Sequence, residues 1–132
     1  MASFLLHPTE ILILLFILLT FVFSGVEKIV DWKGQIVWLK AHFKDTFLVP
    51  ILPLLLGVLV LLDLVVSTLS ILALIFILQF QELTIGLYTC ILAAIVLLFL
   101  LFGQRMAKDF QGAFTIVGYF IVVVFGVWLF SR

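Results

Sequence analysis

The hydrophobic and polar positions divide the chain into long apolar runs separated by short polar segments. An α-helix of about 20 apolar residues crosses a bilayer. Runs of that length or longer cover about residues 10–30, 48–79, 83–102 and 112–130. The pattern therefore predicts an all-α integral membrane protein. It forms one transmembrane domain over residues 1–132, a four-helix transmembrane bundle.

The segment at about 32–45, between the first two runs, has a different pattern. Its apolar side chains recur at helical spacing, and its lysines lie on an adjacent strip: Trp32, Ile36, Leu39, Phe43 and Phe47, beside Lys33, Lys40 and Lys44. Aromatic residues beside lysines are typical of a helix in the lipid headgroup region. We expect an interfacial amphipathic helix whose tryptophan and lysines contact lipid or a partner. A plain connecting loop is the alternative.

The second apolar run, residues 47–80, is long and contains one charge, Asp63. It is either one long tilted helix or a span that breaks near Ser67 and Thr68 and returns. With four spans, the first and third connections lie on one side and carry most of the basic residues: Lys33, Lys40, Lys44, Arg105 and Lys108. Only Arg132 lies on the other side. The positive-inside rule then favours four spans, basic loops in the cytoplasm and both termini outside.

The composition excludes several classes of function. Hydrophobic residues make up 67% of the chain and charged residues only 11%, whereas about 25% are charged in soluble domains. The formal net charge is zero, which gives no reason to expect nucleic-acid binding. His7 and His42 are far apart, so no metal site is predicted, and we expect His42 to be a solvated loop residue. Cys90 has no partner for an internal disulfide.

A polar stripe follows one face of the first span. Thr20, Ser24, Glu27, Lys28 and Asp31 are spaced at i, i+4, i+7, i+8 and i+11, which places them on one side of a helix. Asp63 lies within the second span, with Ser67 and Ser70 on the same face. An intramembrane carboxylate costs about 2.5–3.5 kcal/mol to insert, so we expect it to face the bundle interior.

These two stripes predict a buried polar patch. Its members are Ser24, Glu27, Lys28, Asp31, Asp63 and Ser67. Lys28 is the natural counter-ion for Asp63 or for Asp31. Such a patch either binds a ligand or protons, or joins the helices by hydrogen bonds alone.

Two further patterns occur in the second half of the chain. Gly86, Cys90 and Ala94 are four residues apart and form a face of small residues that allows close helix packing, within one chain or between two. Residues 103–111 form a predicted charged turn, in which Arg105 and Asp109 lie at i and i+4 beside Lys108. We expect a topology signal with a surface ion pair, and a headgroup or partner-docking site is the alternative.

Three segments resemble the DoxX/DoxD family of small bacterial membrane proteins. They are FVFSGVEKIVDW, in which Gly25 and Lys28 meet a G-x-x-K pattern, the acidic Asp63, and FGQRMAKDF before the last span. The family usually carries Glu at the position of Asp63. The resemblance implies a four-helix bundle in the bacterial cytoplasmic membrane. For some members it also implies the small membrane subunit of a thiosulfate:quinone oxidoreductase, or a partner of redox enzymes that handle thiols.

Two functions follow as hypotheses, and the sequence leaves open whether the protein is part of an enzyme. In the first, Glu27, Lys28 and Asp63 line one pocket for a quinone head group, and Lys28 or Asp63 passes protons. A partner enzyme then supplies the electrons. In the second, the protein is a non-catalytic scaffold or anchor subunit that recruits a partner through its basic cytoplasmic face. A solute transporter is less favoured, because four short spans show no inverted pair of broken helices.

Overall fold

The computed structural model describes residues 6–44, 46 and 49–131, and within them it contains helices and no strand. The elements in chain order are α2 (Pro8–Val30), α3 (Trp32–His42), the 3-10 turn η1 (Val49–Ile51), α4 (Leu52–Phe80), α5 (Thr84–Met106) and α6 (Phe110–Ser131). The helices α2, α4 with η1, α5 and α6 are each long and apolar enough to cross a membrane. The predicted all-helical architecture is thereby confirmed.

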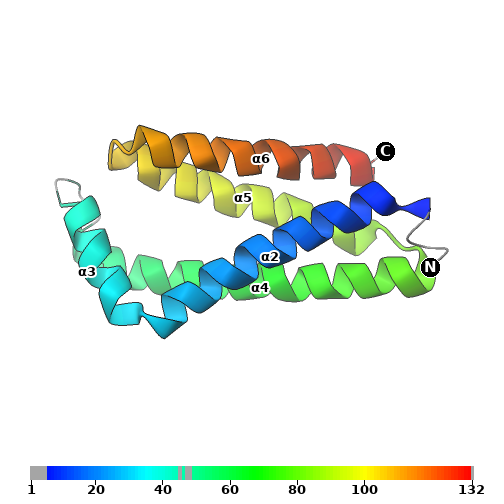
Figure 1. Cartoon of the computed structure of the whole chain (residues 1–132), viewed down its shortest axis with the longest axis horizontal. Helices are drawn as coiled ribbons and strands as arrows, with labels where there is room; N and C mark the ends of the chain where they lie inside the picture. The colour runs from blue at the N-terminus through cyan, green and yellow to red at the C-terminus, as the bar shows by residue number, and fades with distance from the viewer. Residues whose placement is uncertain (1–5, 45, 47–48, 132) are drawn as a thin grey trace.

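These four helices run up and down beside one another, and α2 crosses α4 obliquely (Figure 1). The helix α2 packs mainly against α4, and α5 packs mainly against α6. Contacts between α4 and α5 join the two pairs, while α2 and α6 touch more sparsely. The connection from α4 to α5 lies at one end of the bundle, and α3 and the turn from α5 to α6 lie at the other (Figure 1).

The helix α4 is continuous, which excludes the predicted alternative of a break near Ser67 and Thr68. The hydroxyls of these residues donate to backbone oxygens one turn earlier, Ser67 to Asp63 at 2.7 Å and Thr68 to Leu64 at 2.9 Å. Both hydroxyls are therefore satisfied without opening the helix. At about 1.5 Å per residue, the 29 residues of α4 reach further than a hydrocarbon core of about 30 Å.

The sharp connection after α4 depends on two local features. Gln81 adopts a left-handed conformation with φ 53°, which ends the helix. Glu82 then accepts hydrogen bonds from the hydroxyl and the backbone N–H of Thr84, at 2.6 and 3.2 Å. These bonds stabilise the carboxylate, so they lower the pKa of Glu82.

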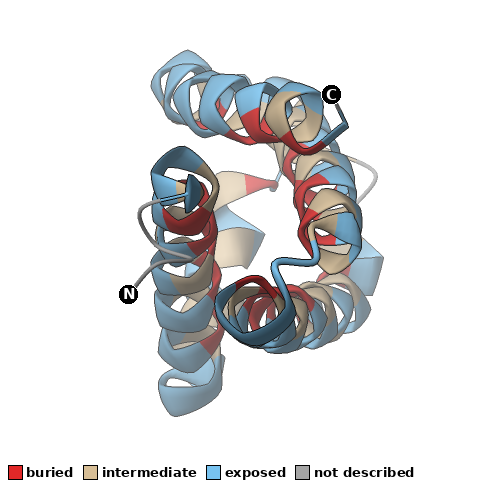
Figure 2. Cartoon of the chain, turned by 90° about the vertical axis from the view of Figure 1, so that its right-hand side faces the viewer, coloured by how far each residue is buried: buried red, intermediate tan, exposed pale blue. Residues whose placement is uncertain are grey.

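The buried residues lie mainly on the sides of the helices that face the other helices of the bundle (Figure 2). Most of them are aliphatic: Leu14, Ile17, Val66, Ala73, Ile77, Val96 and Val123. The outer surface is also apolar, with Leu61 60% exposed and Phe114 79% exposed. Contiguous exposed apolar surface on this scale is typical of a binding or membrane surface, and each of the four helices is long enough to cross a bilayer.

The face of small residues serves within this chain. Gly86 lies against the ring of Phe130, and Gly126 lies against Cys90 on α5 and Ile13 on α2. A Cβ atom at Gly126 would meet Cys90 Sγ at 2.9 Å and Ile13 Cγ2 at 3.0 Å. The glycine therefore allows α6 to approach both neighbouring helices closely.

The turn between α5 and α6 is shorter than predicted. Instead of ending near residue 102, α5 continues to Met106, and α6 begins at Phe110. Lys108 takes a positive φ of 60° in the turn. Asp109 precedes α6 and caps it: its Oδ1 accepts a hydrogen bond from the backbone N–H of Gly112 at 2.9 Å, the usual role of an N-cap carboxylate.

The prediction of an ion pair between Arg105 and Asp109 is wrong, because the turn after α5 separates these two residues. The spacing i, i+4 brings side chains together only on a continuous helix, and here a turn lies between them. The guanidinium of Arg105 instead lies over the ring of Phe110, 4.9 Å from its centroid. Asp109 Oδ2 faces His42 Nε2 on α3 at 3.5 Å.

Replacing Asp109 by alanine is expected to lower the free energy of unfolding by about 1 kcal/mol, because the N-cap is lost. The measurement is reversible unfolding in mixed detergent micelles, followed by circular dichroism. Asp109→Asn should keep most of the stability, because asparagine also caps, and Gln111→Ala on the exposed face of α6 is the matched control. Equal stabilities for Asp109→Ala and Gln111→Ala would contradict this role.

The helix α3 lies across the end of the bundle, steeply inclined to the long helices (Figure 1). It ends at His42 rather than near residue 45, and none of its residues is fully buried. Phe43 follows it and is buried, near Gly103 of α5. Of the predicted apolar face, Phe47 lies outside the described residues, as do Asp45 and Leu48. A helix rather than a plain loop is confirmed for residues 32–42.

Candidate functional site

A compact ionic cluster joins α2 to α4. Lys28 Nζ lies 3.3 Å from Asp63 Oδ2, and Ser24 Oγ donates to the same oxygen at 3.0 Å. Lys28 also donates to the backbone oxygen of Ser24 at 3.3 Å and to its hydroxyl. An ammonium has three protons, so these acceptors account for all of them. We call Ser24, Lys28 and Asp63 the ionic cluster.

Local sequence explains why the cluster forms. Ser24 and Lys28 are one turn apart on α2, so both reach the same side of the helix. Gly25, between them in sequence, allows α4 to approach, since a Cβ atom there would lie 3.3 Å from Asp63 Cβ. The side chain of Asp63 is only 3% exposed and that of Lys28 17%. A carboxylate buried to this extent is stable as an ion only when it is paired and hydrogen-bonded.

The other members of the predicted patch lie elsewhere. Ser67 is buried, but its hydroxyl bonds to its own helix rather than to α2. Glu27 and Asp31 are exposed. Because α2 ends at Val30, Asp31 lies at the corner between α2 and α3 and continues no stripe. Lys28 therefore pairs with Asp63, the first of the two predicted counter-ions.

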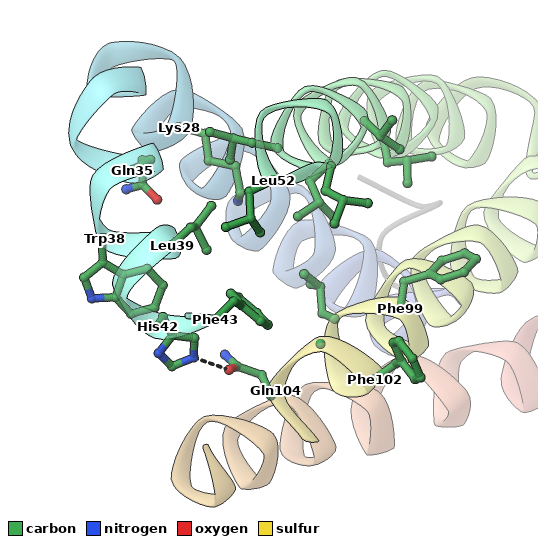
Figure 3. Close-up of a pocket in the computed structure, with 17 residues that line it drawn as sticks. Lys28, Gln35, Trp38, Leu39, His42, Phe43, Leu52, Phe99, Phe102 and Gln104 are labelled. Carbon is green, nitrogen blue, oxygen red and sulfur yellow. Dashed lines mark hydrogen bonds between the residues drawn. The ribbon is translucent and has the colours of Figure 1, made fainter. Parts of the chain in front are cut away.

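Two cavities flank the ionic cluster. The first, of about 510 Å³, lies under α3 and is bordered by residues of α2, α3, α4 and α5; we call it the α3 cavity. Lys28 lies at one edge of it and the His42–Gln104 hydrogen bond at the other, with Leu39, Phe43 and Leu52 between them (Figure 3). The second, of about 470 Å³, is bordered mainly by α2, α5 and α6; we call it the α2–α6 cavity.

The expectation that Glu27, Lys28 and Asp63 line one pocket is not met. Lys28 borders the α3 cavity, whereas Glu27 and Asp63 border the α2–α6 cavity. Adjacent residues on a helix point about 100° apart, so Glu27 and Lys28 leave α2 toward different sides. The contact between Lys28 and Asp63 thus lies between the two cavities.

His42 is not the solvated loop residue that the sequence suggested. Its side chain is 17% exposed and stacks on Trp38 with ring centroids 4.5 Å apart. Its Nε2 lies 3.0 Å from Gln104 Oε1 and 3.5 Å from Asp109 Oδ2. His42 therefore ties α3 to the turn between α5 and α6. The i, i+4 spacing of Trp38 and His42 was the available signal, but their distant partners were not visible in the sequence.

The basic residues gather at the α3 end of the bundle, as expected from the distribution of lysine and arginine among the connections. Among the described residues of the two connections, the cations are Lys33, Lys40, Lys44, Arg105 and Lys108, all of them exposed. Trp32 lies near Gly57 of α4 and is 36% exposed. The opposite connection carries Glu82, and Arg132 lies outside the described residues. The shared location of both basic segments is confirmed.

Groups suited to metal binding are absent from the described part of the chain, since no three His, Cys, Asp or Glu residues there gather closely enough to hold an ion. Cys90 is a buried free thiol in contact with α6.

No protein-family model, curated protein or solved structure matches this chain. The resemblance to the DoxX/DoxD family thus depends on the three sequence segments and stays a prediction.

Proposed function

We propose that this chain is a multi-pass protein of the bacterial cytoplasmic membrane, with both termini outside, that binds a quinone in the α3 cavity. In this proposal it is the small membrane subunit or partner of a redox system, DoxX-like and acting on thiosulfate or thiols. A docked partner enzyme donates the electrons. The observation that carries the proposal is an apolar-walled cavity of about 510 Å³ at the basic end of the bundle.

The lining of the α3 cavity fits a quinone. Its walls are mostly leucine and phenylalanine, including Leu56, Leu59 and Phe99, which suit an isoprenoid tail and a flat ring. Lys28 is engaged within the ionic cluster, so the side chain of Gln35, at the polar border, is better placed to donate to a quinone carbonyl. A bound quinone would supply the capacity to accept electrons.

Filling the α3 cavity tests the proposal. Leu59→Trp is expected to weaken binding of a short-chain quinone at least tenfold, or about 1.4 kcal/mol, because the indole occupies the space of the ring. Leu61→Trp is the matched control, since Leu61 lies on the same helix and is 60% exposed on the outer surface. Binding is measured by titration in lipid nanodiscs. The proposal fails if the two variants bind the quinone equally well.

A specific feature also favours the second hypothesis, a scaffold that recruits a partner. The helix α3 carries exposed Val37 and Trp38 beside Lys33 and Lys40, a surface suited to an acidic partner or to anionic headgroups. Gentle extraction from the native membrane, with mass spectrometry of proteins and lipids together, separates the two functions. A stoichiometric quinone or redox enzyme supports the first, and a non-redox assembly that depends on Lys33 and Lys40 supports the second.

A further inference from the structure

The α2–α6 cavity has hydrogen-bonding groups that the protein itself does not use. The hydroxyls of Thr20 and Tyr119 and the carboxylate of Glu27 border it. None of these three groups has a hydrogen-bond or ion-pair partner among the described residues. Ionisable and polar side chains within a span are costly unless they are satisfied, and they mark functional sites by default.

Asp63 adds a further oxygen without a partner to this set. Its Oδ2 binds Ser24 and Lys28, while Oδ1 has no partner in the described part of the chain. Within the same residues no fully buried side-chain oxygen or nitrogen lacks a partner. Oδ1 therefore reaches open space although Asp63 is only 2% exposed, and the cavity that Asp63 borders is the α2–α6 cavity.

The groups without partners indicate the sign of the charge on a ligand. All three N–H groups of Lys28 already donate hydrogen bonds within the ionic cluster, so Lys28 has no donor left for a ligand in this cavity. Glu27 and Asp63 bring two carboxylates against that one ammonium, which leaves an excess of negative charge and of acceptor oxygens. A cation with N–H donors complements this arrangement, whereas an anion or a carbonyl group would find only two hydroxyls.

The side chains that wall the α2–α6 cavity indicate the chemistry of the uncharged part of the ligand. Leu97, Leu100 and Ile116 are aliphatic, and Phe21 and Tyr119 are aromatic. Aromatic faces attract ammonium groups, and about 470 Å³ lies within the usual range for small-molecule sites.

The rim lies on the outer surface of the bundle. Leu19 and Phe23 border the cavity and are 58% and 61% exposed. The cavity therefore opens on the apolar surface between α2 and α6, the side where these helices touch sparsely. An amphiphile dissolved in the bilayer would reach the cavity directly from there.

We propose that the α2–α6 cavity binds an amphipathic primary amine. Glu27 and Asp63 Oδ1 hold its ammonium group, and the hydroxyls of Thr20 and Tyr119 complete the polar contacts. The alkyl or aryl part lies against the aliphatic wall. This site is separate from the quinone site proposed for the α3 cavity.

The test uses a photoreactive long-chain primary amine and the full-length protein in phosphatidylcholine nanodiscs. Labelling is expected on peptides of α2 and α6, with competition by dodecylamine and none by dodecanol. Glu27→Gln should weaken the apparent affinity at least tenfold, because the exposed carboxylate that pairs with the ammonium is removed. Tyr119→Phe should weaken it less, through the loss of one hydroxyl.

Asp31→Asn is the matched control, because Asp31 is an exposed carboxylate one turn beyond Glu27 and does not border the cavity. It should leave amine binding unchanged. Glu27 makes no contact that folding requires, so its variant should melt as the wild type does. Equal competition by dodecanol, or unchanged labelling of Glu27→Gln, would overturn the proposal. Leu59→Trp should leave amine binding intact, so the quinone and amine proposals can fail independently.

Discussion

Replacing Lys28 by methionine is expected to lower the free energy of unfolding by about 3–5 kcal/mol. Methionine fills a similar volume, but it leaves the Asp63 carboxylate without a counter-ion. The side chain of Asp63 is 3% exposed, so water has little access to Oδ2, the oxygen that loses its ammonium partner. Reversible unfolding in mixed micelles, followed by circular dichroism, measures the loss. A variant within about 1 kcal/mol of wild type would show that Lys28 does not support Asp63.

The double variant Lys28→Met/Asp63→Leu separates the cost of a broken pair from the value of an intact one. Replacing a buried ion pair by apolar residues of similar size is often neutral or stabilising. We therefore expect the double variant to recover to within about 1 kcal/mol of wild type. If it recovers but the amine no longer binds, the pair is kept for function rather than for stability. If it stays as unstable as Lys28→Met, other contacts of Asp63 dominate.

The second large effect is expected at Gly126. Gly126→Leu should destabilise the protein by about 1–3 kcal/mol or prevent its assembly, because overpacking forces a buried interface apart. The new side chain would meet Cys90 on α5 and Ile13 on α2, both buried and both within about 3.0 Å of the first carbon added. Thermal unfolding in detergent, monitored by size-exclusion chromatography, measures the change.

Gly118→Leu is the control for that substitution. Gly118 lies on the same helix, but a Cβ atom there would meet nothing within 4 Å. The variant gains the same side chain and the same helix propensity, so it should be as stable as wild type or slightly more stable. Comparable losses at the two positions would mean that leucine disturbs α6 itself, and the close packing against α5 and α2 would then not be the cause.

The sequence alone was sufficient to predict the long helices and their up-and-down order. Apolar runs of bilayer length predict helices whatever their neighbours are, because the backbone must satisfy its own hydrogen bonds in lipid. The distribution of lysine and arginine favoured four spans with both basic segments at one end of the bundle, and the structure agrees. Whether the second span is continuous was left open by the sequence. The pairing of Lys28 with Asp63 was foreseen as one of two alternatives.

Only the tertiary structure decided which side chains meet across helices. Periodicity assigns a residue to a face of its own helix, but the rotation and axial shift of one helix against the next come from packing. That is why Glu27 and Lys28, neighbours on one predicted stripe, border different cavities. It is also why His42 finds Gln104, 62 positions along the chain. The sequence thus determined which polar side chains lie on each face of a helix. The packing of α2 against α4 and α6 determined which of these side chains come together to form a site.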